Sequence, residues 1–136
     1  MRRFLILPPV LVLLLLTMGA APANSRHVKV TLQPVDGSGI SGFAVLEGLP
    51  HGKGTVITVH ATGLTPGTEY LSLYYGNHTC ELEPYSAQDV IGHYVGASDG
   101  TGNANGRADD DLDEINSVSV RLASDFSLRA CGDVHP

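Results

Sequence analysis

The chain has 136 residues, a formal net charge of −6 and no tryptophan. This length suits one domain with a single core. The negative charge argues against binding to nucleic acid or to an anionic membrane surface, since both would repel the chain. The two cysteines are too few for a zinc knuckle.

The N-terminal segment has the layout of a secretory signal peptide. Two arginines follow the first methionine, residues 4–18 form an almost unbroken apolar run, and Ala21-Pro22-Ala23 fits the small-residue cleavage pattern. The alternative is an uncleaved membrane anchor. However, about 15 apolar residues with two prolines are short against the roughly 20 that span a bilayer. We expect cleavage after residue 23.

Removal of this signal peptide, residues 1–23, defines a mature domain, residues 24–136. The mature domain then contains six basic and fourteen acidic residues, which gives a net charge of −8. We therefore expect a secreted or periplasmic protein without a stable membrane anchor.

The mature part is expected to be all-β, because apolar and polar residues alternate with the period of two that is typical of strands. Clusters of Gly, Pro, Asp and Ser separate the runs, as in a small sandwich or barrel. The polar stretch 97–114 is expected to be a loop with at most one short strand, and Asn105-Gly106 resembles a hairpin turn. The alternating runs are His27–Leu32, Ser41–Leu46, Gly54–Ala61, Tyr70–Tyr75 and Asn116–Leu122.

The cysteines, Cys80 and Cys131, are expected to form a disulfide, since an even number of cysteines in an exported chain favours pairing. The alternative is two buried free thiols. Closing a loop of roughly fifty residues is worth on the order of 4 kcal/mol in the chain-entropy model.

Four segments resemble the Cu/Zn superoxide dismutases, in the same order along the chain. Gly63-Leu64-Thr65-Pro66-Gly67 is similar to the turn that precedes the copper-binding strand of that family. The segment 28–47 resembles its first hairpin, Ile91-Gly92-His93-Tyr94 its G-H-F segment, and residues 128–132 its last strand with the second half-cystine. The resemblance implies a Greek-key β-sandwich or barrel of about eight strands, and homodimers by analogy.

The metal ligands of that family are largely missing. The resemblance places a His-x-His pair of copper ligands on the outward face of the strand after the turn. Ser72 and Tyr74 are expected there, with Leu71 and Leu73 facing the core. A hydroxyl and a phenol are poor substitutes for imidazole on copper. His93 matches the family's bridging histidine, but residues 94–102 and 120–122 contain no further histidine.

At most one ligand of the usual set remains. We therefore expect a protein that is not an enzyme, has no cofactor, and acts as a binding or structural module for an unidentified protein or small-molecule ligand. The alternative is a residual metal-binding protein or superoxide dismutase that uses His93 to hold a divalent metal weakly.

Two surface features remain as further hypotheses. Tyr70, Ser72, Tyr74 and Tyr75 are expected on the former metal face, where they would form a binding patch or simply cover the barrel. His78 and His93 together would give a weak divalent site.

An acidic run and a sequon complete the candidates. Asp109-Asp110-Asp111, with Asp113 and Glu114, follows the stretch Asp99-Gly-Thr-Gly-Asn103-Ala-Asn105-Gly106, which faintly resembles a calcium loop. The spacing lacks the Glu at position twelve, so a solvated turn is the favoured interpretation. Asn77-His78-Thr79 is an N-x-T sequon, which matters only in a source that glycosylates exported proteins.

Overall fold

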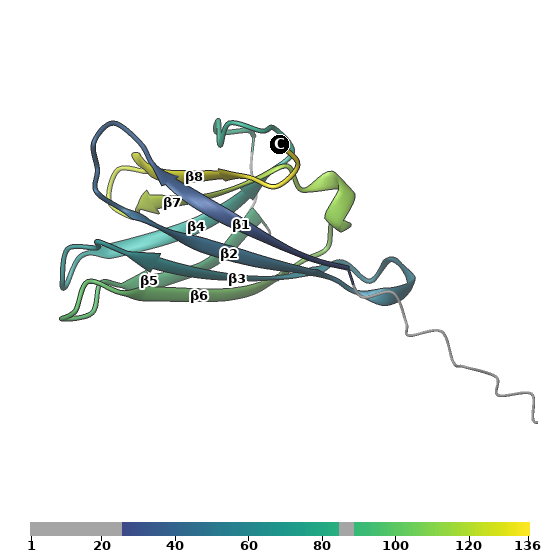
Figure 1. Cartoon of the computed structure of the whole chain (residues 1–136), viewed down its shortest axis with the longest axis horizontal. Coiled ribbons are helices and arrows are strands. Elements are labelled where there is room, and N and C mark those ends of the chain that lie inside the picture. The colour runs from purple at the N-terminus through teal and green to yellow at the C-terminus, as the bar shows by residue number, and fades with distance from the viewer. Residues whose placement is uncertain (1–25, 85–88) are drawn as a thin grey trace, which may run out of the picture.

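The computed structural model describes residues 26–84 and 89–136, so the predicted signal peptide lies outside the described residues. The described part is all-β, as expected: eight antiparallel strands form a nearly closed barrel (Figure 1). Helix in this part is limited to short 3-10 turns, and none of it is long and apolar enough to cross a membrane. The elements are β1 (Arg26–Pro34), β2 (Ser41–Gly48), η1 (Pro50–Gly52), β3 (Thr55–Thr62), β4 (Glu69–Tyr75), β5 (Val90–Val95), β6 (Gly102–Ala108), η3 (Leu112–Glu114), β7 (Ser117–Leu122) and β8 (Leu128–Asp133).

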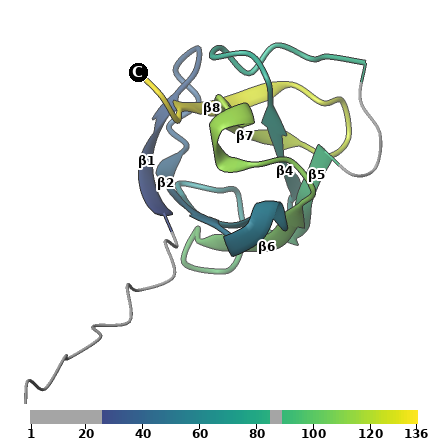
Figure 2. The ribbon, with the colours of Figure 1, turned by 90° about the vertical axis from the view of Figure 1, so that its right-hand side faces the viewer.

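The strands follow the order β5-β4-β7-β8-β1-β2-β3-β6 around the barrel. Viewed along the barrel they form a ring, which closes where β5 lies beside β6 (Figure 2). Strand β3 pairs with β6 and not with the next strand in the chain, β4. This return connection makes β3 to β6 a Greek key, which confirms that expectation.

The five alternating runs agree with β1, β2, β3, β4 and β7 to within two residues at each end. The alternation is clearest in β3, where Thr55, Ile57 and Val59 are fully buried. Such strands are predictable because one face packs on the core and the other faces solvent.

The stretch 97–114 differs from the expected hairpin turn. Asn105-Gly106 lies inside β6, where the two residues pair with Thr58 and Ile57 of β3. A Cβ atom at position 106 would lie 2.2 Å from the carbonyl oxygen of Ile91, so the glycine permits the close approach of β5. The Asn-Gly pair therefore serves the barrel closure and makes no turn.

Buried apolar side chains form two groups. The barrel core fills the interior and includes inward-facing residues of all eight strands. A smaller group, which we call the outer cluster, lies on the other side of β4, β7 and β8. It contains Leu71, Leu73, Tyr75 and Cys80, packed against Val90, Ala123, Phe126, Leu128 and Cys131.

Candidate functional site

Strand β4 carries the residues that were expected to face a former metal site, and its orientation is the reverse of that expectation. Tyr70 and Tyr74 belong to the barrel core, whereas Leu71, Leu73 and Tyr75 belong to the outer cluster. The leucines therefore occupy the outward positions. Both faces of β4 are apolar and covered, so alternation alone did not reveal which face is the interior.

The polar groups that β4 turns inward are paired inside the barrel. The Ser72 and Tyr94 hydroxyls lie 2.7 Å apart, and the Tyr70 hydroxyl accepts a hydrogen bond from the Thr65 backbone N–H at 3.0 Å. The rings of Tyr70 and Tyr94 stack with centroids 6.2 Å apart. Burial raises the pKa of Tyr94 to about 12. These partners explain how hydroxyl groups are accommodated in the core.

The predicted tyrosine patch is wrong, because none of its members is exposed. Tyr70, Ser72, Tyr74 and Tyr75 are 2%, 0%, 7% and 4% exposed. Burial, together with the charge of Asp110 and a hydrogen bond to it, holds the pKa of Tyr74 well above its ordinary value. A binding surface cannot be built from these side chains.

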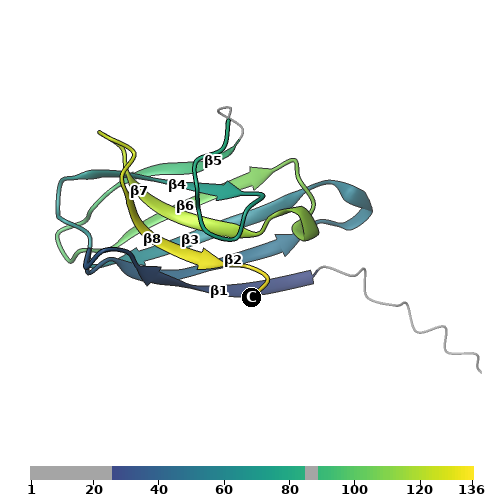
Figure 3. The same ribbon diagram turned by 90° about the horizontal axis from the view of Figure 1, so that it is seen from above.

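The predicted disulfide is confirmed. Cys80, in the loop that follows β4, is bonded to Cys131 of β8. This loop lies over β7 and β8 (Figure 3), and the Cys80 backbone N–H donates to the Ser117 hydroxyl at 3.2 Å. Cys80 is completely buried. The outward face of β7 is therefore covered by a cross-linked loop.

Arg121 is the central polar residue of this covered face. It is 6% exposed, and its guanidinium donates to the Tyr75 hydroxyl at 2.8 Å, to the Cys80 carbonyl at 2.6 Å and to the Phe126 carbonyl. The Tyr75 hydroxyl also lies 2.7 Å from the Ser119 hydroxyl. An arginine keeps its charge in such surroundings, so a permanent cation stands beside the outer cluster.

In the sequence, Arg121 is one of the polar residues of the alternating run Asn116–Leu122, and this alternation alone does not indicate that it is buried. The available signal was the composition of that face: the other outward residues of β7 are Ser117 and Ser119, which are small and fully buried. Small polar side chains leave room for a covering loop and offer it hydrogen bonds. An arginine among them is then a candidate to hold the loop.

His93 is exposed on β5, at the position paired with Leu71 of β4. It lines a shallow cavity of about 380 Å³ together with Glu69, Tyr94 and Val95. Among the described residues that line this cavity, His93 and Glu69 carry an imidazole and a carboxylate, which are side-chain types that can ligate metals. Across the described ranges, no group of three or more His, Cys, Asp or Glu side chains is positioned to share a metal ion.

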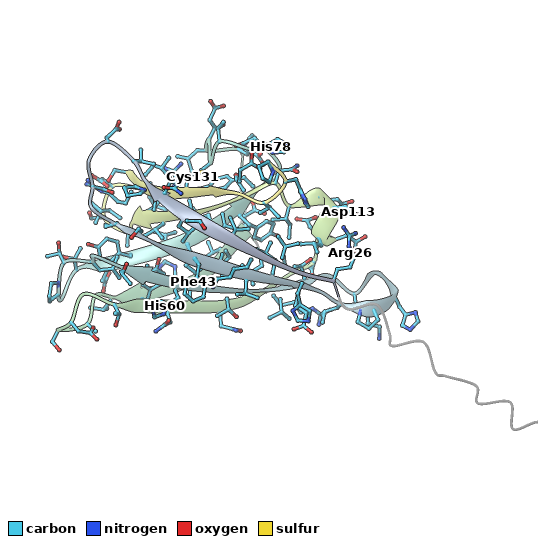
Figure 4. All side chains as sticks on the ribbon, viewed as in Figure 1. Arg26, Phe43, His60, His78, Asp113 and Cys131 are labelled. Atoms are coloured by element: carbon cyan, nitrogen blue, oxygen red, sulfur yellow. A yellow bond between two sulfur atoms is a disulfide. The ribbon has the colours of Figure 1, made fainter. Side chains whose placement is uncertain are left out.

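The acidic residues proposed for calcium have local roles. Asp113 forms an ion pair with Arg26 at 2.7 Å, at the end of the barrel (Figure 4). The carboxylate of Asp99 accepts hydrogen bonds from the backbone N–H and the hydroxyl of Thr101, which hold its pKa below the ordinary value. The contacts of Asp99 are those of a capped turn.

The loop that carries the sequon is held by its own side chains. The Asn77 amide donates to the Glu81 carbonyl and to the Glu83 carboxylate, both at 2.8 Å. His78 lies 2.8 Å from the carboxylate of Asp133. The hydrogen bond from His78 holds the pKa of Asp133 below its ordinary value. The Asn77 amide and His78 thus both contribute to the folded loop.

Comparison with known proteins gave no family: no protein-family model and no curated protein matches the chain.

Proposed function

We propose that this chain is an exported, non-catalytic relative of the Cu/Zn superoxide dismutases that acts as a binding or structural module outside the cytoplasm. The Greek-key barrel and the Cys80–Cys131 bond are features that the sequence resemblance implies. They support the proposal, but many unrelated proteins share such folds, so the argument depends on the chemistry of the site.

The observation that carries the proposal is the nature of the side chains on the outward face of β4 and β7. Leu71 and Leu73 occupy the outward positions of β4, and Arg121 lies beside them under the disulfide-linked loop. Leucine has no atom that can donate an electron pair to a metal. A guanidinium is permanently positive and repels a metal cation in a poorly solvated site. This face is suited to apolar packing.

A second candidate function is weak metal binding at His93. The observation in its favour is that His93 is exposed and shares a cavity with the Glu69 carboxylate. One imidazole and one carboxylate provide two ligands, whereas zinc sites usually have at least three protein ligands. Such a site would hold zinc or copper only loosely.

The test is metal loading followed by a dismutase assay. The full chain is purified from a host that exports it, incubated with Cu(II) and Zn(II), dialysed against a weak chelator and measured for bound metal and superoxide dismutation. We expect well under one ion per chain and no activity above free copper. His93→Ala should then behave like the unmodified chain.

The control for that test is His51→Ala, which removes an imidazole from the 3-10 turn η1, away from β5. Stoichiometric copper with dismutation that disappears in His93→Ala but persists in His51→Ala would overturn the proposal. Stoichiometric metal that depends on His93 without dismutation would instead establish the second candidate.

A further inference from the structure

The β1–β2, β3–β4 and β7–β8 connections lie at the end of the barrel opposite the 3-10 turns η1 and η3 (Figure 1). Residues at this end line a small pocket. Its volume is about 290 Å³. The described residues that line it include one arginine and no carboxylate, in a chain whose acidic residues outnumber its basic ones. The lining residues include Ser38, Ile40, Thr68, Tyr70, Leu122 and Arg129.

Arg129 is the unusual member of this lining. Its side chain is half-buried, and its Nε–H is fully buried without a hydrogen-bond acceptor in the described part of the chain. The carboxylate of Asp125 interacts with the charge of Arg129 only electrostatically, through space. Arg121, by contrast, donates from all three of its nitrogens. Because the Nε–H is fully buried, a ligand in the pocket does not reach it. The rest of the half-buried guanidinium lines the pocket and would be the charged donor for an anion there.

The walls of the pocket are fixed by the backbone. The Arg129 carbonyl accepts hydrogen bonds from the Val35 N–H at 3.0 Å and the Ser38 hydroxyl at 2.6 Å, which tie the β1–β2 loop to β8. Gly63 packs so closely on the same loop that a Cβ atom there would lie 2.2 Å from the Gly39 carbonyl oxygen. The pocket therefore exists before any ligand arrives, which reduces the entropic cost of binding.

The lining indicates the class of ligand. A guanidinium presents a planar fork of N–H donors that suits a carboxylate. Tyr70 uses its oxygen to accept from Thr65, so its own hydrogen can be donated. Ile40 and Leu122 provide an apolar wall beside these donors.

We infer that the pocket binds a small organic carboxylate with an apolar body, whose carboxylate pairs with Arg129 and whose body contacts Ile40 and Leu122. This ligand class specifies the binding role proposed above, and in that respect it rests on the proposed function. It does not depend on the absence of dismutase activity, so the two proposals fail in different experiments.

The test is a titration of the isotope-labelled full chain with benzoate, followed by NMR chemical shifts. Benzamide has the same shape without the charge, and sulfate has the charge without the apolar body. We expect saturable benzoate shifts centred on the pocket, and at least tenfold weaker binding of benzamide and of sulfate.

Variants locate the effect. Arg129→Gln removes the cation, and Thr68→Tyr fills the pocket from a side chain that makes no hydrogen bond in the described residues. Each should weaken benzoate binding at least tenfold, whereas Arg107→Gln, which removes an exposed arginine of β6, should leave it unchanged. If Arg129→Gln does not fold, Thr68→Tyr decides the question.

Several results would overturn the inference. These are the absence of saturable shifts, equal affinity for benzamide or sulfate, and unchanged benzoate affinity in the folded Arg129→Gln or Thr68→Tyr variant.

Discussion

Replacing Arg121 by methionine should destabilise the protein strongly, because this side chain connects three segments. Its guanidinium donates to Tyr75 in β4, to the Cys80 carbonyl in the covering loop and to the Phe126 carbonyl in the β7–β8 turn. Methionine fills a similar volume with an unbranched apolar chain, so the loss is mainly that of the charge and the donors.

The expected magnitude follows from the groups left behind. The Tyr75 hydroxyl retains its contact with Ser119, but the carbonyls of Cys80 and Phe126 lose a donor. A buried acceptor without a partner costs about 1–3 kcal/mol. Since the buried cation is removed at the same time, we expect a net loss of about 2–4 kcal/mol, a large part of the 5–15 kcal/mol that stabilises a typical domain.

Urea unfolding of the oxidised protein measures this loss as a lower midpoint at an unchanged slope. The matched control is Arg107→Met. Arg107 is exposed and donates to the Lys53 carbonyl at 2.6 Å, so its removal should cost about 0.5 kcal/mol or less. A loss below about 1 kcal/mol for Arg121→Met would refute the reasoning, because the covering loop would then be held without the arginine.

Three further predictions concern the barrel closure, the disulfide and the covering loop. Gly106→Ala should lower the free energy of unfolding by about 1–3 kcal/mol, because the new Cβ meets a carbonyl of β5. The control Gly48→Ala should change it little, since its Cβ would have its nearest neighbour at 3.5 Å. Equal urea midpoints for the two variants would contradict this prediction. Reduction of the disulfide, whose cysteines are 51 residues apart, should lower the free energy of unfolding by about 4 kcal/mol. Equal urea midpoints with and without reductant would contradict this prediction. His78→Ala should raise the pKa of Asp133 toward 3.8, as measured by NMR titration, because the hydrogen bond that lowers it is removed. The lowered pKa of Asp133 means that this carboxylate stabilises the fold above pH 3.8, and that this stabilisation is lost as the pH falls through the lowered pKa. The His78→Ala variant should therefore lose less stability on acidification than the unmodified chain. An Asp133 pKa that does not move in the variant would contradict the assignment.

The fold was largely predictable because most strands have one buried face and one solvated face. In β3 the buried residues Thr55, Ile57 and Val59 repeat with a period of two, and the strand was predicted to within one residue at each end. In β6, with the sequence GNANGRA, burial also alternates, but the inward residues are only glycine and alanine, so the apolar signal is weak. At Gly106 the small residue is required by the close approach of β5, which is a contact between distant segments that the local sequence does not show.

The site was less predictable. The disulfide followed from compartment and parity, and it is present. The tyrosine patch failed because Leu71 and Leu73 were assumed to face the core, while the inward positions hold Tyr70 and Tyr74. A tyrosine enters a core when its hydroxyl finds a partner, and those partners come from other segments of the chain, so the pattern of β4 alone could not show it.

The reversed orientation of β4 also changes the question that the resemblance raises. With Ser72 and Tyr74 outward, the metal face that the resemblance implies would have held weak oxygen ligands. With Leu71 and Leu73 outward, β4 contributes no ligand atom to that face, and the leucines pack in the same cluster as the disulfide. Arg121 then stabilises the covering loop by hydrogen bonds to neutral oxygens. Introducing histidines at the two leucine positions would therefore place imidazoles in an apolar cluster beside a permanent cation, which opposes metal binding by both desolvation and charge. The disulfide and its loop in this chain stabilise a packed surface, and that role requires no metal.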